Sequence, residues 1–432
     1  MKTTTANMPA ELRRILGLFD MAKAAYLLFK CEHVLEGQNK NLDVLLRTAE
    51  DYSNASRLLE QQGYVLYMGE RVEKYKKMYV YFDGKTVSAV HLHREVAWHG
   101  VVVLDKEKIF ERTQGKIPSP EDSLLIHSAH ALFENFKVKD YQRKLLEKYK
   151  REVKNWKYVD LQLSKFCWKK AFYRFLPYFS VSAGMILKAY HGRLWKNPRL
   201  FFTLSNKALK ICSRKISLRR KGHLISLIGM NGSGKSTTKD ALLKSYEPLT
   251  NFVAGQQGYY FGWKQSSVGK IISPIFSKGN KKMFDVVSEE KVKNFDLFQE
   301  ALFLLMYAKF MNRYVQEIYP HLRKNKLVVT DRYFYDLFGQ YPYSEKSVVL
   351  KLLPIPKPDL LIVLDADVDT AMNRDKGGKA ERIVQPREKL EGQRRRYLEV
   401  AQRNGALILS AEKDFEKNLS TIINSTWKEY LG

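Results

Sequence analysis

The C-terminal half of the chain alternates short apolar runs with longer amphipathic segments. Three apolar runs, Leu224–Ile228, Leu327–Thr330 and Leu360–Leu364, each lead through a polar turn into a segment with helical spacing. Runs of this length suit buried parallel strands, and strands that alternate with helices form a sheet covered on both faces. The pattern predicts an α/β domain over residues 223–432, with a parallel sheet flanked by helices.

Residues 1–150 mix helical and strand-like segments, which predicts an α+β domain. Asp83-Gly84 is a typical two-residue hairpin turn between two alternating runs. A helix is expected to begin after the turn residues Pro118 to Asp122. The expected helices are Leu12–His33, Ala49–Gln62 and Ser123–Phe136, and the expected strands are Leu42–Leu46, Tyr64–Tyr67, Met78–Phe82 and Val87–His93.

Positive charge is concentrated between these two domains. The whole chain has a net charge of +28, and residues 151–222 alone carry 18 Lys and Arg against two acidic residues. Aromatic residues interleave with this charge, and Phe201–Lys221 has an amphipathic pattern. Three interpretations stay open: a solvated helical connector, peripheral contact with an anionic membrane surface, and, least favoured because no recognised module accompanies the charge, nucleic-acid binding.

Cysteine usage and hydropathy indicate a cytoplasmic protein. The three cysteines, Cys31, Cys167 and Cys212, are scattered, which argues against a disulfide framework or a zinc site built on thiolates. The most apolar stretch, Phe175–Leu187, is shorter than the roughly 20 residues that a bilayer span needs. We therefore expect a cytoplasmic location, with attachment to the inner membrane face as the variant that the basic segment allows.

The first apolar run leads into a phosphate-binding loop of the form G-x-x-x-x-G-K-S. Glycines let the backbone turn tightly and point its N–H groups at phosphate oxygens, and the following helix directs its positive dipole end at the same anion. The lysine is expected to reach the β- and γ-phosphates of ATP, and the serine hydroxyl to bind Mg²⁺. The expected nucleotide-binding residues are Gly229, Asn231, Gly232, Ser233, Gly234, Lys235, Ser236 and Thr237.

Acidic and basic residues follow the other two apolar runs. Asp331 and Arg332 end the second run, where a carboxylate would lie over the ligand crevice and hold Mg²⁺ while the arginine grips a phosphate oxygen. Asp365 and Asp367 end the third run, and there we favour structural roles, with Asp367 capping the next helix. Arginines then follow in a glycine-containing stretch and beyond it; Arg374 and Arg382 are the candidates for charge neutralisation at a transferring phosphoryl group, whereas Arg394–Arg396 suit a solvated helix.

Taken together, residues 223–432 resemble the thymidylate kinase family of nucleoside-monophosphate kinases. The matching pieces are the loop Gly229–Ser236, Asp331-Arg332-Tyr333, the run Pro358–Asp365 and the stretch Arg374–Tyr397. The resemblance implies a P-loop kinase that uses ATP and Mg²⁺, acts on a small phosphorylated acceptor and forms a homodimer. It assigns metal and acceptor phosphate to the Asp331–Arg332 pair, and closure over ATP to Arg374 and Arg382.

The acceptor half departs from the family pattern. The family carries an acidic residue before the first loop glycine and an aspartate two residues after it, where this chain has Ile228 and Asn231. At the position of a further acceptor-binding arginine the chain has Phe310, for which Lys309 or Arg313 are the candidate substitutes. Phosphoryl transfer is therefore expected, and the acceptor is left open.

The N-terminal domain resembles a family of uncharacterised nucleotidyltransferases in altered form. Those enzymes hold two metals with three aspartates that follow a Gly-Ser turn. This chain keeps Asp43, but it has Asn41 and His91 at the other two positions and Gly37-Gln38 at the turn. One carboxylate cannot replace three, so we expect this domain to be non-catalytic. The histidines of this domain match no standard metal-binding spacing, and we expect structural roles for them: His91, His93, His99, His127 and His130.

The leading hypothesis is an ATP- and Mg²⁺-dependent kinase whose acceptor is a nucleoside monophosphate or a related phosphorylated small molecule. An acceptor that is already a phosphate needs no general base; for a hydroxyl acceptor Asp336 would be the candidate base. The rival from another class is a nucleotide-gated binding protein whose basic segment engages a membrane or a partner. A third hypothesis, phosphorylation of nucleic-acid ends, predicts steeply salt-dependent polynucleotide binding.

Overall fold

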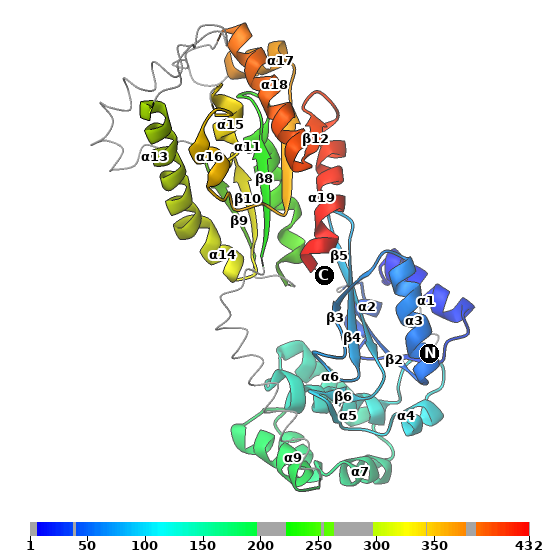
Figure 1. The fold of residues 1–432 in the computed structure, drawn as a ribbon. Helices are drawn as coiled ribbons and strands as arrows, with labels where there is room; N and C mark the ends of the chain where they lie inside the picture. The colour runs from blue at the N-terminus through cyan, green and yellow to red at the C-terminus, as the bar shows by residue number, and fades with distance from the viewer. Residues whose placement is uncertain are drawn as a thin grey trace. The chain divides into compact units, whose positions relative to one another are not determined.

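The computed structural model describes two compact units, residues 1–217 and 218–431. Within the chain, the structure describes residues 7–37, 40–196, 222–251, 255–262, 297–342, 344–376 and 386–431. Each unit has its own five-stranded sheet and its own hydrophobic core (Figure 1). Among the described residues, no helix combines the length and apolarity that crossing a bilayer requires.

The N-terminal unit is built on a mixed sheet with the strand order β1-β2-β5-β4-β3. Strands β2 and β5 run parallel, and the other neighbours pair antiparallel. The bounds of the strands are β1 Tyr26–Leu28, β2 Asn41–Leu46, β3 Val65–Met68, β4 Lys76–Phe82, β5 Val87–His93, and the short pair β6 Ala97–Trp98 and β7 Val101–Val102. The predicted hairpin is present, and the Asp83 carboxylate accepts the N–H groups of Lys85 and Thr86 at its turn.

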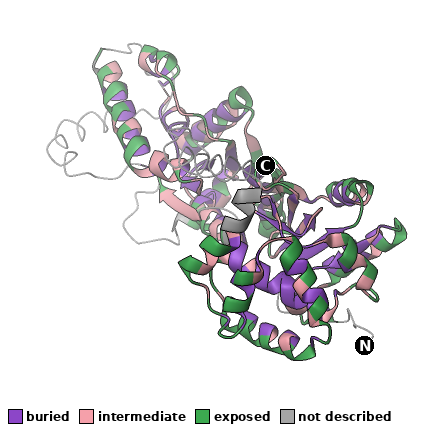
Figure 2. Ribbon diagram, turned by 90° about the horizontal axis from the view of Figure 1, so that it is seen from below, coloured by how far each residue is buried: buried purple, intermediate pink, exposed green. Residues whose placement is uncertain are grey.

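Helices cover both faces of this sheet. The α1 and α3 helices pack on one face and α5 on the other, and Figure 2 shows how most helices carry buried residues on one side and exposed residues on the other. The predicted helix over Ala49–Gln62 is present as α3, and a reciprocal capping box between Thr48 and Asp51 begins it. The bounds are α1 Ala10–Met21, α2 Glu32–Leu35, α3 Ala49–Gln61, α4 Lys106–Arg112, α5 Pro120–His130, the π-helical turn η2 Ala131–Asn135, and α6 Asp140–Glu152.

The predicted single helix over Leu12–His33 is wrong. The α1 helix ends at Met21, Lys23 takes a left-handed backbone conformation (φ 54°), and the chain continues as β1. Residues Tyr26–Leu28 then pair with Val44–Leu46 of β2. Tertiary strand pairing outweighs the helical spacing here, because Tyr26 and its neighbours bury their side chains in the two cores that flank the sheet.

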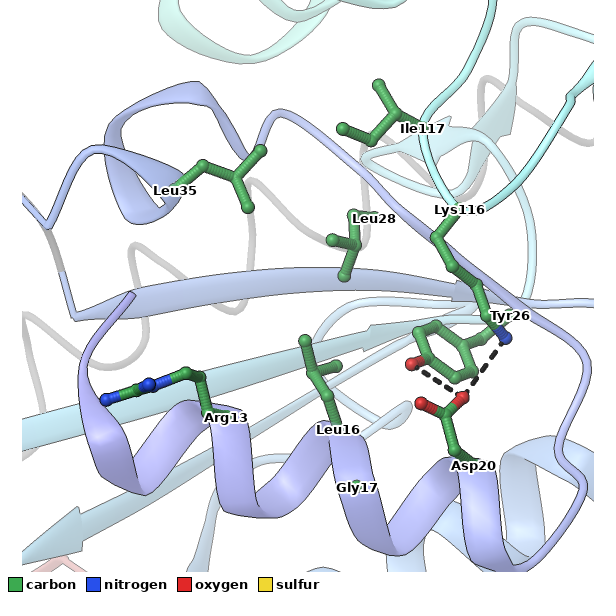
Figure 3. Close-up of a pocket in the computed structure, with 9 residues that line it drawn as sticks. All are labelled: Arg13, Leu16, Gly17, Asp20, Tyr26, Leu28, Leu35, Lys116 and Ile117. Carbon is green, nitrogen blue, oxygen red and sulfur yellow. Dashed lines mark hydrogen bonds and ion pairs between the residues drawn. The ribbon is translucent and has the colours of Figure 1, made fainter. Parts of the chain in front are cut away.

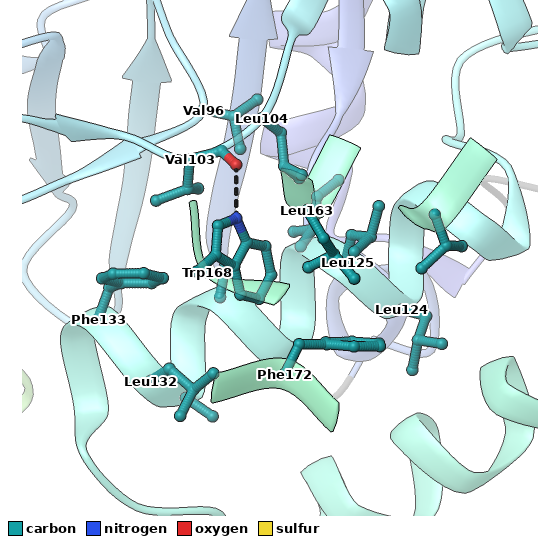
Figure 4. Close-up of a cluster of buried hydrophobic side chains, with 14 of the residues drawn as sticks. Val96, Val103, Leu104, Leu124, Leu125, Leu132, Phe133, Leu163, Trp168 and Phe172 are labelled. Atoms are coloured by element: carbon teal, nitrogen blue, oxygen red, sulfur yellow. Dashed lines mark hydrogen bonds between the residues drawn. The ribbon is translucent and has the colours of Figure 1, made fainter. Parts of the chain in front are cut away.

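The basic segment 151–222 was expected to be a connector separate from the N-terminal domain, and its described part lies in the N-terminal unit instead. It forms α7 Trp156–Lys165, α8 Lys169–Phe175 and α9 Ala183–Lys196. Trp168 is 1% exposed, donates its indole N–H to the Val103 carbonyl at 3.0 Å and meets Phe133 and Phe172 edge to face (Figure 4). Trp168, Phe172 and Phe175 are therefore core residues, whereas Tyr173 and Tyr178 are exposed together with most of the charged side chains. The amphipathic segment 201–221 falls outside the described residues.

The carboxylates after Pro118 help to join these helices. Glu121 accepts the backbone N–H groups of Lys154 and Asn155, and Asp122 accepts the Tyr158 hydroxyl at 2.6 Å. These contacts connect the start of α5 to the start of α7. The Pro118–Asp122 motif is thus a structural feature of this unit.

The C-terminal unit has the predicted parallel sheet, with the strand order β12-β11-β8-β10-β9. Its strands are β8 His223–Ile228, β9 Gln256–Tyr260, β10 Leu327–Asp331, β11 Leu360–Asp365 and β12 Leu407–Ser410. The three predicted apolar runs form β8, β10 and β11, which lie side by side at the centre. Their side chains are almost entirely buried, as expected for strands covered on both faces.

Helices follow the strands as the alternating pattern predicts. Their bounds are α11 Lys235–Ser245, the 3₁₀ turn η3 Glu247–Asn251, α13 Leu297–Arg313, the π-helical turn η5 Tyr314–Ile318, α14 Tyr319–Arg323, α15 Asp336–Gln340, α16 Val348–Leu352, α17 Val368–Lys376, α18 Arg387–Asn404 and α19 Phe415–Leu431. In an open parallel sheet, ligands bind outside the carboxyl ends of the strands, where successive connections leave in opposite directions. The ends of β8, β10 and β11 therefore define the place to look for a site (Figure 1).

Candidate nucleotide-binding site

The glycine-rich loop joins the carboxyl end of β8 to the first turn of α11, and all eight of its predicted nucleotide-binding residues lie there. Gly229, Gly232 and Gly234 have positive φ angles of 142°, 79° and 88°. A Cβ atom on Gly232 would lie 2.3 Å from the carbonyl oxygen of Ala371 in α17. The loop therefore needs glycine both for its backbone conformation and for its close approach to the neighbouring helix.

Two side chains at the start of α11 carry the expected chemistry. Lys235 is buried and donates to the Met230 carbonyl and to the Ser233 hydroxyl, the latter at 3.3 Å. Ser236 donates its hydroxyl proton to Asp331 Oδ2, which joins the loop to the end of β10. Thr237 is exposed on the first turn of the same helix. The predicted phosphate ligand and the predicted metal ligands are thus neighbours at one edge of the sheet.

The Asp331 carboxylate has the character of a Mg²⁺ ligand. It is 2% exposed, and its Oδ1 atom is buried without a hydrogen-bond partner in the described part of the chain. A buried carboxylate oxygen without a partner is costly, because it has lost its water and gained nothing in return. Mg²⁺ prefers oxygen ligands and retains several waters. The oxygens of Ser236 and Asp331 therefore fit this ion, and the nucleotide phosphates would complete the set.

Arg332 is held at the same edge by two polar side chains, and a third side chain supports one of them. Its backbone is left-handed (φ 75°), and its guanidinium donates to the Asn231 side-chain oxygen and, at 3.3 Å, to Asp336 Oδ2. The other Asp336 oxygen accepts the Tyr397 hydroxyl at 2.6 Å. Burial raises the pKa of Asp336, although Arg332 and Tyr397 act in the opposite direction. Both oxygens of Asp336 are engaged, so this residue orients Arg332 rather than standing ready as a base.

The contact between Asn231 and Arg332 accounts for one departure from the family pattern, the asparagine at a position where aspartate was expected. An aspartate there would place a second carboxylate on the Arg332 guanidinium, which already faces Asp336. The neutral amide accepts a hydrogen bond without adding negative charge beside the phosphate-binding loop. This contact between the loop and the end of β10 spans 101 residues of sequence, so no local pattern indicated it.

The arginines after β11 fall into separate groups. Arg374, on α17, donates to the Ala411 carbonyl at 3.2 Å, and Arg382 lies outside the described residues. Arg394 of α18 forms a two-bond ion pair with Asp365, at 2.7 and 2.8 Å. Asp365 thus has the structural role that was expected of it. Its partner is Arg394, which was expected on a solvated helix face. Arg396 was expected to be solvated as well, but it is 8% exposed and donates to the Gly339 carbonyl.

The candidate substitutes for the acceptor-binding arginine differ in how far they are engaged. Phe310 is buried in the core of the unit. Arg313 donates to the carbonyls of Tyr260 and Gly262, both at 2.8 Å, and pairs with Glu317. Lys309 is partly buried, and burial followed by the nearby Arg313 charge lowers the pKa of its ammonium group. Arg313 therefore fixes the chain just beyond β9.

In the N-terminal unit, all five singled-out histidines have acidic partners, and three of them each pair with a different glutamate. His127 lies 2.9 Å from Glu32, His130 lies 3.0 Å from Glu134, and His99 lies 3.7 Å from Glu73. The other two, His91 and His93, converge on Asp43, which sequence spacing did not indicate. Burial lowers the pKa of both imidazoles, more than the Asp43 carboxylate raises it. Asn41 is exposed at the start of β2, and Gln38 lies outside the described residues.

A hollow of about 300 Å³ lies between α1, β1 and the loop before α5 (Figure 3). Its apolar wall includes Leu16 and Leu28, and its polar rim is a small network. Asp20 accepts the Tyr26 hydroxyl at 3.0 Å and pairs with Lys116 at 3.3 Å, and the Lys116 ammonium lies over the Tyr26 ring. The polar groups on the rim thus bind one another. This leaves fewer of them to contact a ligand than at the carboxyl end of β8.

A glycine-rich loop at the carboxyl edge of a parallel sheet, with a lysine and a serine at the start of the next helix and an aspartate hydrogen-bonded to that serine, defines a P-loop kinase-like nucleotide-binding domain. Comparison with known proteins gives the family. A model of the thymidylate kinase family matches residues 228–422. The C-terminal unit of this chain belongs to the thymidylate kinase family, and the match leaves the N-terminal unit outside it.

Individual relatives agree with this assignment. A probable thymidylate kinase of Methanocorpusculum labreanum is 30% identical over 167 residues, which cover 35% of this chain and 69% of that protein. One of Pyrococcus horikoshii is 28% identical over 225 residues, which cover 49% of this chain and 99% of that protein. Among solved structures, a thymidylate kinase of Candida albicans matches with 19% identity and a TM-score of 0.35, over 50% of this chain and 95% of that one.

Proposed function

We propose that the C-terminal unit transfers the γ-phosphoryl group of ATP to a nucleoside monophosphate, with Mg²⁺ as cofactor. The observation that carries the proposal is the buried Oδ1 atom of Asp331, which has no hydrogen-bond partner among the described residues and lies beside Ser236 of the phosphate-binding loop. An oxygen of the acceptor phosphate attacks the γ-phosphorus, the bond to the β–γ bridging oxygen breaks, and ADP leaves. Membership of the thymidylate kinase family supports this reaction type.

The residues divide the work by charge. Lys235 exchanges its contact with the Met230 carbonyl for the donor phosphates, and the loop N–H groups surround the same oxygens. Bound Mg²⁺ would neutralise charge on the β- and γ-phosphates, held by Ser236 and Asp331. Arg332, oriented by Asn231 and Asp336, positions the acceptor phosphate. Arg374 and Arg382 are proposed to neutralise charge on the transferring group.

Thymidylate is the first acceptor to test, because the relatives are called thymidylate kinases. The altered acceptor half, with Phe310 in the core and Arg313 engaged by backbone carbonyls, supports a base specificity that differs from theirs. Nucleoside monophosphates with other bases therefore belong in the same panel.

The test is ADP production with each acceptor and with none. The wild type is expected to be stimulated by at least one nucleoside monophosphate, and Lys235→Ala and Asp331→Asn are expected to lose that stimulation. Asp367, which is half-buried two residues after β11, provides the matched control, and Asp367→Asn should keep it. Slow ATP hydrolysis that no acceptor accelerates would contradict the kinase and favour a nucleotide-gated binding protein.

We further propose that the outer face of α7–α9 contacts anionic membrane surfaces. Leu161 of α7 and Leu187 of α9 are 62% and 70% exposed among lysines, and Tyr178, in the turn after α8, is 71% exposed. Exposed apolar side chains among basic residues suit a headgroup boundary. Sedimentation with vesicles that contain phosphatidylserine tests the idea. Binding that persists unchanged after Leu161→Ser and Leu187→Ser, or that matches neutral vesicles, would contradict it.

A further inference from the structure

A cluster of ionisable side chains lies on one face of the N-terminal sheet, and it owes its existence to the pairing of two parallel strands. Asp43 of β2 stands directly opposite His91 of β5. Side chains alternate along a strand, so His93 points to the same face as His91. Their neighbours Val44 and Leu92 point to the opposite face, into the core under α1 and α3. The sheet thus brings one carboxylate and two imidazoles together from positions 48 and 50 residues apart.

The three side chains converge on a small volume. Asp43 Oδ1 lies 3.1 Å from His91 Nδ1 and 2.9 Å from His93 Nε2, and one ligand atom from each of the three lies within 4.8 Å of the others. We propose that Asp43, His91 and His93 bind a divalent transition-metal ion of the Zn²⁺ type. Two imidazoles and one carboxylate are a ligand set for such ions, whereas Mg²⁺ and Ca²⁺ prefer oxygen alone.

The hydrogen-bonding capacity of the cluster is not used up within the described residues. His91 Nε2 and His93 Nδ1 are buried there without hydrogen-bond partners. The other nitrogen of each ring, His91 Nδ1 and His93 Nε2, faces the Asp43 carboxylate and is the atom that would bind the ion. His93 is 1% exposed at its side chain and packs against the Phe29 ring, while His91 is 15% exposed. The ion would therefore enter from the side of His91.

A lysine now supplies the positive charge that the metal ion would bring. Lys30 Nζ lies 3.5 Å from Asp43 Oδ1, longer than a hydrogen bond, and its side chain is 11% exposed. A lysine ammonium is a point charge on a flexible stem, so it can withdraw toward the opening of the cluster. Three converging ligands would stabilise a metal ion more than Asp43 stabilises the Lys30 ammonium in one ion pair at this distance. Lys30 is consequently a competitor of the metal, and its removal should strengthen binding.

The second lysine nearby is occupied elsewhere. Lys76 of β4 pairs with Glu134 at 3.6 Å, and Glu134 in turn contacts His130 at 3.0 Å. The charges of Lys76 and Glu134 cancel, so a metal ion at Asp43 would not face an isolated positive charge from Lys76. Three protein ligands also leave a coordination position for water or a substrate oxygen, as in catalytic rather than structural zinc sites.

The test is titration of the full, untagged chain with ZnCl₂ against a chromophoric chelator, without nucleotide. The wild type is expected to bind one equivalent at this site. His91→Ala should weaken that binding by more than about 100-fold, since outer-shell groups alone change metal affinity 10–100-fold. His91→Cys restores a ligand and should retain most of the affinity. Lys30→Met should tighten binding by about tenfold, the lower end of that range.

His321→Ala, in the C-terminal unit, is the matched control and should leave Zn²⁺ affinity unchanged. Near-ultraviolet circular dichroism of each variant checks that the fold is kept; His91 borders the opening and is the ligand best placed to tolerate change. Equal Zn²⁺ affinity in the wild type and His91→Ala would overturn the proposal. The proposal would also be overturned if Lys30→Met lowered the melting temperature without raising the affinity for Zn²⁺. The cluster would then be a structural ion-pair network. Neither outcome depends on kinase activity.

Discussion

Replacing Tyr397 by phenylalanine removes one hydroxyl group from the support of Arg332. The hydroxyl donates to Asp336 Oδ1 at 2.6 Å, and Asp336 Oδ2 contacts the Arg332 guanidinium. Tyr397 is 2% exposed and Asp336 is 3% exposed, so water cannot readily replace the lost donor. Gly339 packs directly against the Tyr397 ring, which leaves the ring itself in place after the change. The substitution therefore removes the hydrogen bond to Asp336 and a second contact of the same hydroxyl, with Gln340.

The structure sets the expected magnitude. A hydrogen bond to a charged group contributes about 1.5–3 kcal/mol, so the unfolding free energy of the C-terminal unit should fall by about 2 kcal/mol. Arg332 keeps its contacts with Asp336 and Asn231 but loses rigidity. If roughly 1.4 kcal/mol of this loss reaches the transition state, kcat/KM for the acceptor falls about tenfold. The KM for ATP should not change, because Lys235 and the loop are untouched.

Urea unfolding and steady-state kinetics with varied acceptor and varied ATP measure these two effects. Tyr335→Phe is the matched control: Tyr335 is 6% exposed, and the described residues offer its hydroxyl no hydrogen-bond partner. The reasoning is refuted if Tyr397→Phe behaves like Tyr335→Phe. It is refuted equally if KM for ATP rises as much as KM for the acceptor, since Arg332 would then not be specific to the acceptor side.

Three further predictions concern other parts of the chain. Gly232→Ala should weaken binding of a fluorescent ATP analogue more than about tenfold, because its Cβ would meet the Ala371 carbonyl oxygen; Gly255→Ala, with positive φ but open space, is the control and should bind normally. Trp168→Ala should lower the unfolding free energy of the N-terminal unit by about 3–5 kcal/mol, as judged by urea unfolding, while ATP-analogue binding survives. Glu32 has a pKa lowered to about 2: burial raises it, but contacts with a histidine and a tyrosine outweigh burial. Its contribution of about 3 kcal/mol is therefore present above pH 4.5 and lost as pH falls toward 2, and Glu32→Gln should flatten that dependence in acid unfolding.

The sequence pattern predicted those elements whose stabilising contacts come from residues close by in the sequence. The strand, loop and helix around Lys235 follow from an apolar run, glycines and a helix start within a short stretch. Asp331 could be placed because the end of a buried parallel strand lies at a known edge of the sheet. The α3 helix was likewise predicted closely, since its helical spacing over Ala49–Gln62 is contained in one short stretch of sequence.

Features that depend on pairing across the sheet could not be predicted in this way. Helical spacing over Leu12–His33 gave no sign that Tyr26–Leu28 would pair with β2. The cluster at Asp43 requires the β2–β5 register, and the contact between Asn231 and Arg332 requires the positions of β8 and β10. The basic aromatic helices were assigned to a connector because charge dominates their composition. Their aromatic residues, Trp168 above all, decide where they pack.

The contacts of Lys235 have a consequence for ligand discrimination. Its ammonium group already has acceptors in the Met230 carbonyl and the Ser233 hydroxyl, and the Ser236 hydroxyl is already bonded to Asp331. An incoming anion must break both arrangements before it gains any contact of its own. A triphosphate with its Mg²⁺ replaces both at once, whereas an isolated inorganic phosphate replaces one at most. The loop thus favours a metal-bound nucleotide over an isolated phosphate, because only the nucleotide compensates for the loss of both sets of contacts.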